Sequence, residues 1–458
     1  MSTFFIENFG CRATEADAAA IRCALLARGF VSEPDAARAD VVVLNTCTVT
    51  AAADSQAREA VRKIYRANPA ASIVVTGCYA QRAPEELAAL DGVACVVGNS
   101  HQADLPALLS TLAAPRSPVS PCSDFVPSHQ LAAEPMSLLH GPAKILTGNI
   151  FAHTMLPLVS AGQVESDRTR PILKIQDGCN NRCSYCVIPF VRGRSRSLPP
   201  DAVVDGVRTL VASGAREIVL SGINLGAYGR DLVPRAGLRS VVQRILAETS
   251  LEQLRFSSIE PQDVTEDFVA LAASSDRIAP HFHIPLQSAS DHILRAMHRW
   301  YRAAHYAQRL NLIRRFMPHA AIGADLIVGF PGESEADFQA TVEFIEHQPF
   351  TYLHVFSFSE RPGTEAEKLG QRVPAITIRE RARYLRALGQ QKTAAFRASQ
   401  AGRVVRALTL ARSGDNCTEA LTGDYLKVRI AGRLPANHWL DVPIASGERA
   451  IVEPSRCA

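Results

Sequence analysis

The stretch ILKIQDGCNNRCSYC, residues 172–186, joins an apolar strand to three cysteines, Cys179, Cys183 and Cys186, in the spacing C-x3-C-x2-C. Three thiolates on one short loop can hold three irons of a cubane cluster and leave the fourth iron open to a small ligand. A structural zinc ion is the alternative, but zinc needs a fourth protein ligand and no cysteine or histidine follows closely. The spacing therefore favours an iron–sulfur cluster.

Apolar strands and helices alternate from about residue 170 to 395, which indicates six βα-like units and a partial or full barrel. The strands are expected near ILKIQDG, EIVLSGI, QLRFSSIE, HFHIPLQS, IGADLIVGF and LHVFSFS. A long basic helix, roughly 376–400, closes this domain.

The N-terminal region predicts a parallel sheet with covering helices. Apolar strands at 3–9, 41–47 and 73–78 alternate with alanine-rich helical stretches at 14–28 and 52–67. Each strand leads to a cysteine: Cys11, Cys47 and Cys78. Open α/β sheets bind ligands at the carboxyl ends of their strands, so one crevice could gather all three thiols. Taken singly, each cysteine could equally be a small buried core residue.

Two further segments complete the expected organisation. Residues 115–165 are rich in proline and serine and predict a linker, whereas the short strands after residue 398 predict a small β-barrel. The fold class is therefore α/β, with an N-terminal parallel α/β domain (1–114), the linker (115–165), a partial (β/α) barrel core (166–397) and the C-terminal β-barrel (398–458).

Composition limits the function classes. The chain has 458 residues, 47% of them hydrophobic, and a formal net charge of +4, which permits a polyanionic partner without requiring one. No signal peptide or membrane-spanning stretch is expected, so the 11 cysteines should lie in a reducing, cytoplasmic compartment as ligands or buried thiols.

The segment KIQDGCNNRCSYCVIPFVRGRSRS resembles the radical-SAM superfamily, and its methylthiotransferase branch in particular. The resemblance implies that the open iron binds S-adenosylmethionine and that the cluster cleaves it to a 5′-deoxyadenosyl radical. It also implies a second [4Fe–4S] cluster on Cys11, Cys47 and Cys78, which makes two clusters and six cysteine ligands. The family commonly has asparagine three residues after the first cysteine, where this chain has Thr14.

Several strand ends of the middle domain resemble the family's contacts to S-adenosylmethionine. The residues concerned end the segments EIVLSG, RFSSIE, HFHIPLQ and IGAD, or come shortly after one of them. A glycine at such a place lets the backbone approach a ligand closely, although a plain βα turn would also use one. The expected cofactor-binding residues are Gly222, Asn224, Glu260, Gln287 and Asp325.

Short matches favour tRNA as the substrate. Residues 45–50 and 222–229 resemble the branch that acts on N6-threonylcarbamoyladenosine at position 37, beside the anticodon, where it inserts methylthio at C-2. The alternatives are the same chemistry on N6-isopentenyladenosine of tRNA or on a ribosomal-protein aspartate, and a non-catalytic zinc and RNA-binding protein. An electron donor such as flavodoxin or ferredoxin is implied as a second partner.

Basic residues after the cluster loop and on the long helix could neutralise tRNA phosphates, and the C-terminal barrel resembles the RNA-binding TRAM module. A solvated helix face is the other interpretation of the helix residues. Residues 298–302 interleave aromatic and cationic groups, which suits base stacking or a packing edge. The candidate phosphate contacts are Arg192, Arg194, Arg196, Arg379, Arg381, Arg383, Arg386 and Lys392.

Overall fold

The computed structural model describes residues 1–112, 143–154, 156, 169–414, 416–447 and 450–453. Most of the predicted linker, and Cys122 and Cys457, lie outside these ranges. The chain forms two compact units, residues 1–153 with 190–192, and residues 154–189 with 193–458. In the described ranges no helix combines the length and the apolar character needed to cross a bilayer.

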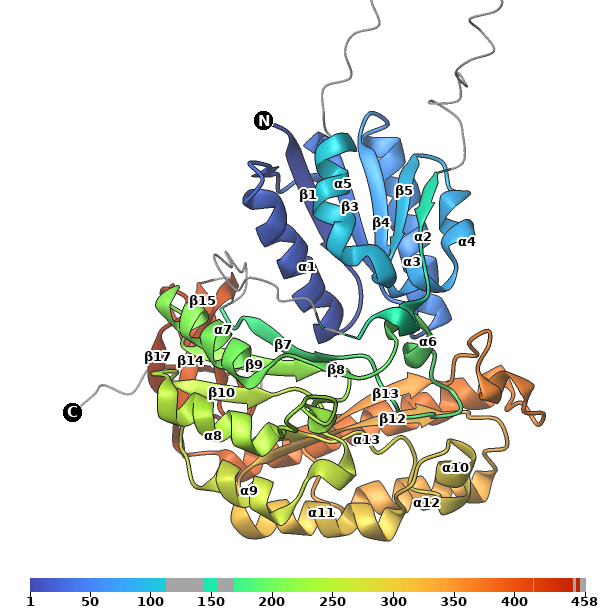
Figure 1. Ribbon diagram of the computed structural model, residues 1–458. Helices are drawn as coiled ribbons and strands as arrows, with labels where there is room; N and C mark the ends of the chain where they lie inside the picture. The colour runs from blue at the N-terminus through green and yellow to red at the C-terminus, as the bar shows by residue number, and fades with distance from the viewer. Residues whose placement is uncertain (113–142, 155, 157–168, 415, 448–449, 454–458) are drawn as a thin grey trace, which may run out of the picture. The chain divides into compact units, whose positions relative to one another are not determined.

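The first unit is a six-stranded parallel sheet in the order β2-β1-β3-β4-β5-β6 (Figure 1). Its strands are β1 (Thr3–Asn8), β2 (Val31–Ser32), β3 (Val41–Thr46), β4 (Ser72–Gly77), β5 (Val93–Gly98) and β6 (Lys144–Leu146). All six residues of β3 are buried, as the run VVVLNT predicts for a central parallel strand covered on both faces. Strand β6, from the segment expected to be a linker, pairs with β5 at the sheet edge.

Helices cover both faces of this sheet. They are α1 (Arg12–Leu26), α2 (Ala51–Ala67), α3 (Cys78–Arg82), α4 (Pro84–Ala88) and α5 (Leu105–Leu112). Ile21 and Leu25 of α1 pack on one face with Leu105 and Leu109 of α5. Helices α2, α3 and α4 pack on the other face, where Val61 lies in the core. The strand-then-helix alternation expected from the sequence is confirmed.

The second unit contains the predicted barrel strands as two sheets, β10-β9-β7-β8 and β11-β12-β13. The strands are β7 (Ile172–Asp177), β8 (Arg196–Ser197), β9 (Glu217–Gly222), β10 (Gln253–Phe256), β11 (His281–His283), β12 (Ala321–Val328) and β13 (Tyr352–Ser357). Isolated parallel bridges, Leu254 to Ile278 and Ser258 to His283, connect the two sheets beside β10 and β11. The result is a partial barrel, and all six expected strands are present.

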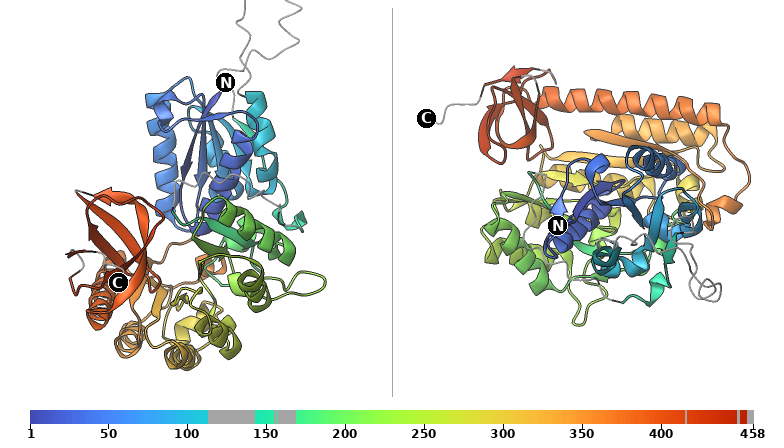
Figure 2. Two further views of the ribbon diagram at one scale, coloured as in Figure 1. Left: turned by 90° about the vertical axis from the view of Figure 1, so that its left-hand side faces the viewer. Right: turned by 90° about the horizontal axis from the view of Figure 1, so that it is seen from above.

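Helices surround the partial barrel on its outer side (Figure 2). They are α7 (Pro200–Ala212), α8 (Leu238–Glu248), α9 (Glu266–Ala273), α10 (Asp291–Ala296), α11 (Ala303–Phe316), α12 (Glu335–His347) and α13 (Ala375–Gln400), whereas the short α6 (Ile188–Arg192) is divided between the two units. One large apolar cluster joins these helices to the sheets. The predicted long basic helix is α13, which packs along β13.

The C-terminal segment is a curled five-stranded sheet in the order β17-β14-β15-β16-β18, at the end of α13 (Figure 2). Its strands are β14 (Val404–Gly414), β15 (Cys417–Thr422), β16 (Lys427–Ala431), β17 (Trp439–Pro443) and β18 (Ile451–Val452). It has its own apolar core, which includes Ala420, Ile430 and Val442. The expected small β-barrel is consistent with this arrangement.

Candidate active site

The first cysteine triplet lies at the carboxyl edge of the first sheet. Cys11 is the N-cap of α1, Cys47 follows β3, and Cys78 begins α3 directly after β4. The three thiols are close enough that each of Cys11 and Cys78 raises the pKa of Cys47 electrostatically. The strand-end rule therefore places the three residues together, as the sequence predicts.

Thr14 lies in the first turn of α1 and closes this turn with its side chain. The Thr14 hydroxyl donates to the carbonyl oxygen of Cys11 at 2.8 Å. Gly10 has φ +114, and a Cβ there would lie 2.5 Å from the Cβ of Cys47. Glycine is thus required for the close approach of the first two cysteines.

A buried arginine contacts this triplet. Arg192 donates through Nε to the Sγ of Cys78 at 3.2 Å and through a terminal nitrogen to Asp17 at 2.8 Å. Asn99 also approaches Cys78, with its amide nitrogen 3.5 Å from Sγ. The side chains of Arg192 and Asp17 are 2% and 3% exposed. The positive charge next to the thiol is therefore shielded from water.

Burial makes the thiols of Cys47 and Cys78 hard to ionise without a positively charged partner. It raises the pKa of Cys47 to about 12, with the neighbouring Cys78 and Cys11 adding to the effect. Burial also raises the pKa of Cys78, against the opposing effect of Arg192. A cationic metal centre stabilises thiolates, so this donor set fits an iron–sulfur cluster.

The second triplet lies on the loop between β7 and α6. The Cys179 backbone N–H donates to the Gly193 carbonyl at 3.1 Å, and the Cys186 N–H donates to the Cys183 carbonyl at 3.0 Å. Burial raises the pKa of Cys179 to about 11 and that of Cys186 to about 12. Backbone hydrogen bonds within the loop and to the residue after α6 thus fix the loop, and it too carries thiols that need a cationic partner to ionise.

This triplet also has a buried arginine beside it. Arg299 donates to the Sγ of Cys183 at 3.2 Å and forms an ion pair with Glu260. The side chain of Arg299 is 2% exposed. Burial raises the pKa of Glu260, against the lowering effect of Arg299. The second site thus also has a guanidinium that is shielded from water.

Histidine and aspartate side chains also form a tight group of potential metal ligands. Among the described residues, the group with three ligand atoms all within 4.8 Å of one another is His283, Asp325 and His354, and it contains no cysteine. A single zinc ion holds its ligands at about 2.0–2.3 Å and so requires such tight grouping.

Three of the residues expected to contact S-adenosylmethionine lie around the second triplet. The Asn224 backbone N–H donates to the side-chain oxygen of Gln176 at 2.8 Å, and its side chain hydrogen-bonds to Cys179. Gly222 lies beside the same glutamine, because a Cβ added at Gly222 would lie 2.9 Å from that oxygen. Glu260 is close enough to raise the pKa of Cys179 electrostatically.

The remaining two expected residues lie on the neighbouring sheet. Gln287, with φ +66, donates its N–H to the Asp325 carbonyl at 2.8 Å. The carboxylate of Asp325 is near enough to raise the pKa of Glu260. Burial opposes ionisation of Asp325, but hydrogen bonds from His283 and His354 outweigh it and lower its pKa.

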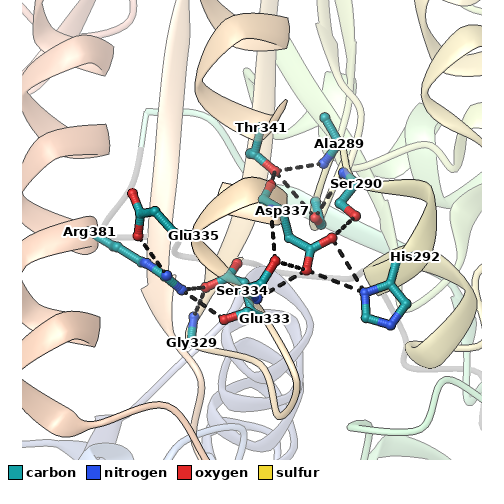
Figure 3. A network of polar contacts seen from close by, with 11 residues as sticks. Ala289, Ser290, His292, Gly329, Glu333, Ser334, Glu335, Asp337, Thr341 and Arg381 are labelled. Carbon is teal, nitrogen blue, oxygen red and sulfur yellow. Dashed lines mark hydrogen bonds and ion pairs between the residues drawn. The ribbon is translucent and has the colours of Figure 1, made fainter. Parts of the chain in front are cut away.

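The loop after β12 is held by a network of polar contacts (Figure 3). Glu333 accepts a hydrogen bond from the Gly329 N–H at 2.8 Å and forms an ion pair with Arg381 at 2.7 Å. Arg381 also pairs with Glu335 at 2.9 Å. These contacts fix the loop that follows Asp325.

The structure corrects part of the expected phosphate-binding set. Arg192, Arg196 and Arg381 are buried, the first and last in ion pairs, so they are not available to a polyanion. Lys392 and Arg386 donate to backbone carbonyls. Arg194, Arg379 and Arg383 are exposed.

The aromatic and cationic run at 298–302 divides in the same way. Arg299 and Tyr301 are buried, whereas Trp300 is 61% exposed. The packing interpretation thus holds for Arg299 and Tyr301, whereas the ring of Trp300 is accessible to a ligand.

Sequence reasoning missed the residues that surround the thiols of the first triplet. No local sequence pattern indicates that Asp17, Asn99 and Arg192 surround Cys78. The contacting residues are far apart in the chain. Burial of Arg192 beside a strand-end cysteine becomes evident only in the folded chain.

Comparison with known families and proteins gives consistent matches. Residues 3–98 match the family described as "Uncharacterized protein family UPF0004", and residues 173–345 match the radical SAM superfamily. The threonylcarbamoyladenosine tRNA methylthiotransferase MtaB of Aquifex aeolicus is 35% identical, over 93% of this chain and 96% of the relative. Its counterpart in Bacillus subtilis is 33% identical, over 94% and 91%.

Two other matches are broader. A tRNA-2-methylthio-N(6)-dimethylallyladenosine synthase of Syntrophobacter fumaroxidans is 34% identical, over 83% of this chain and 78% of the relative. The radical S-adenosylmethionine methyltransferase TsrM of Kitasatospora setae superimposes with a TM-score of 0.57 at 17% identity, over 80% of this chain and 77% of that one. The last match supports the fold alone.

Proposed function

This chain belongs to the radical-SAM methylthiotransferase family, and we propose that it inserts a methylthio group at C-2 of N6-threonylcarbamoyladenosine at position 37 of tRNA. The observation that carries the proposal is the presence of two cysteine triplets at strand ends in a chain that aligns over nine tenths of its length with enzymes of that activity.

The residues present fit two [4Fe–4S] clusters. Cys179, Cys183 and Cys186 would hold the cluster that, when bound, supplies the electron for reductive cleavage of S-adenosylmethionine to methionine and a 5′-deoxyadenosyl radical. Cys11, Cys47 and Cys78 would hold the second cluster, which carries the sulfur.

The protein's own residues have the task of binding and positioning. We assign Gly222, Asn224, Glu260, Gln287 and Asp325 to the binding of S-adenosylmethionine, because they lie at carboxyl strand ends around the Cys179 loop. Arg299 would hold Glu260 in place and stabilise negative charge on Cys183.

The partners follow from the reaction. The C-terminal β-barrel and the exposed Arg194, Arg379 and Arg383 would contact tRNA, since cationic side chains neutralise phosphates. A reductant such as flavodoxin or ferredoxin would supply the electron, and a cytoplasmic location would give access to both partners.

Metal analysis tests the cluster assignment. Anaerobically reconstituted wild-type protein should contain about eight irons, and a Cys179/Cys183/Cys186→Ala triple variant about four, as two cubane clusters predict. A Cys23→Ala variant serves as the control, because Cys23 lies near the C-terminal end of helix α1, whereas Cys11 caps the N-terminal end of that helix. Zinc in place of iron in the wild type would instead support the non-catalytic zinc and RNA-binding alternative.

A nucleoside profile tests the substrate. In tRNA from a deletion strain, 2-methylthio-N6-threonylcarbamoyladenosine should disappear and its precursor should accumulate. Loss of the methylthio form of isopentenyladenosine, or of methylthio-aspartate in a ribosomal protein, would favour the corresponding alternative substrate.

A further inference from the structure

A polar face lies on the inner side of strands β11, β12 and β13. Ile322, Ala324 and Leu326 of β12 point into the large apolar cluster shared with the outer helices. Because side chains alternate along a strand, Gly323 and Asp325 point to the opposite face. His283 on β11 and His354 on β13 are on this face too, since both contact the Asp325 carboxylate.

Direct contacts organise this face into one group. Asp325 accepts from His283 Nε2 at 3.0 Å and from His354 Nδ1 at 3.3 Å, and both contacts use the same oxygen, Oδ1. The Tyr352 hydroxyl lies 2.9 Å from His283 Nδ1 and 2.9 Å from His281 Nε2. The ring nitrogens of His283 are therefore both engaged, which fixes the orientation of its imidazole.

Gly323 makes room for this arrangement. A Cβ at Gly323 would lie 1.9 Å from the ring of Tyr352. The absence of a side chain lets the tyrosine ring lie across β12 and bring its hydroxyl between the two histidines. The group is thus held by close packing as well as by hydrogen bonds.

The exposed fraction of the side chain increases from His283 through Asp325 to His354. The side chains of His283, Asp325 and His354 are 7%, 23% and 51% exposed. Asp325 also acts electrostatically on Glu260, whose partner Arg299 contacts Cys183. The polar face therefore continues from the surroundings of the second cysteine triplet and ends in an accessible imidazole.

The chemistry of the group suits a polar ligand with both donors and acceptors. We propose that His354, held in place by Asp325 and His283, binds the threonylcarbamoyl side chain of the substrate adenosine, an inference that rests on the proposed function. His354 donates to the carboxylate of that side chain, and its contact with Asp325 orients the imidazole for this bond.

The same group disfavours an isopentenyl side chain. That substituent has no hydrogen-bonding atom, so its binding would bury these polar groups without giving them new partners, which is unfavourable. A site built to hydrogen-bond its substrate can reject an analogue that lacks the polar atoms by roughly 10⁴-fold or more. The polar face thus acts as a specificity element.

The test uses reconstituted full-length holoenzyme and two tRNA substrates, one with threonylcarbamoyladenosine and one with isopentenyladenosine at position 37. His354→Phe keeps a ring but removes the donor, and His319→Phe, at an exposed position, is the matched control. We expect His354→Phe to raise KM for the first substrate by roughly 10- to 100-fold and to reduce the discrimination between the substrates. His319→Phe should keep the KM, the discrimination and the rate of 5′-deoxyadenosine release of the wild type.

Other outcomes overturn the inference in distinguishable ways. Unchanged KM and discrimination in His354→Phe, with an active wild type, would overturn the assignment of the polar face alone. A wild type that modifies only the isopentenyl substrate would overturn the proposed function and this inference with it. Stoichiometric binding of Zn²⁺ or Mn²⁺ that His354→Phe abolishes would make the group a metal site instead, in keeping with its ligand atoms lying within 4.8 Å of one another.

Discussion

Arg192 donates to the sulfur of Cys78 at 3.2 Å while forming a buried ion pair with Asp17. The second unit repeats this relationship, since Arg299 donates to Cys183 at 3.2 Å and pairs with Glu260. In each unit a buried guanidinium thus connects one cysteine of a triplet with one carboxylate. Such a contact orients the thiol and stabilises its negative charge, whatever the charge state of the rest of the site.

Removing the first of these arginines should weaken the first cysteine site. Arg192→Leu removes one partner of the buried ion pair with Asp17, and such a loss costs about 3–5 kcal/mol. Urea denaturation measures this loss. In a Cys179/Cys183/Cys186→Ala background the same substitution should also lower the remaining iron content.

The neighbouring Arg194→Leu is the matched control, because Arg194 is exposed. It should leave both stability and iron content near those of the parent protein. Equal iron retention in the Arg192 and Arg194 variants would show that the contact with Cys78 has no part in holding the cluster.

Removing the second arginine should lower the reduction potential of the cluster on the Cys179 loop. A hydrogen bond to a ligating sulfur stabilises the more negative, reduced form. A charge-assisted bond is worth about 1.5–3 kcal/mol, which corresponds to roughly 60–130 mV for a one-electron couple. A redox titration of Arg299→Leu in a Cys11/Cys47/Cys78→Ala background measures the shift on one cluster.

The control for this variant is Arg295→Leu, on the exposed side of α10. Its potential should equal that of the parent. A potential of Arg299→Leu that is unchanged or higher would contradict a direct role of the Arg299 contact with Cys183.

The limits of sequence-based prediction follow from the distances along the chain. The cysteines of the second triplet lie within eight residues, and parallel strand ends bring the first triplet together, so spacing and periodicity predict both sets. Arg192 contacts a cysteine 114 residues away, and Arg299 contacts one 116 residues away. No local pattern records such a contact, which is why the sequence alone assigns the buried Arg192 to phosphates.

The capping box of α12 should contribute stability that depends on pH. Asp337 accepts from the Ser334 N–H at 3.0 Å and from the Ser290 hydroxyl at 2.5 Å (Figure 3). Burial opposes ionisation of Asp337, but the hydrogen bonds from Ser290 and Ser334 outweigh it and lower the pKa from 3.8 to about 2. The contribution of ionised Asp337 to stability is therefore complete above pH 3.8, the ordinary pKa. It is lost as the pH falls through the lowered pKa of about 2.

Asp337→Ala should cost about 1–2 kcal/mol of unfolding free energy at pH 7, as the loss of a helix cap does. The difference from wild type should shrink as the pH falls from about 4 to about 2. Urea denaturation of cluster-free protein across this range measures it. A difference that stays constant down to pH 2 would mean that the carboxylate charge contributes nothing.

Arg255 should hold the C-terminal β-barrel on the radical-SAM core. It pairs with Glu217 at 2.6 Å and donates to the carbonyls of Gly423 at 2.9 Å and Thr422 at 3.1 Å. Both Arg255 and Glu217 are fully buried. Arg255→Met removes all of these bonds and leaves Glu217 without this partner, so we expect a loss of about 3–5 kcal/mol.

Limited proteolysis measures the local effect, because cleavage near residues 400–404 should become faster when the barrel opens away from the core. Arg216→Met is the matched control, since Arg216 is about 40% exposed and its pair with Glu252 lies at the surface. The double variant Arg255→Met/Glu217→Leu should recover part of the lost stability, because the buried carboxylate is then removed too and only the partly exposed Arg170 loses its 3.3 Å pair with Glu217. Cleavage of Arg255→Met at the wild-type rate would mean that other contacts suffice to hold the barrel in place.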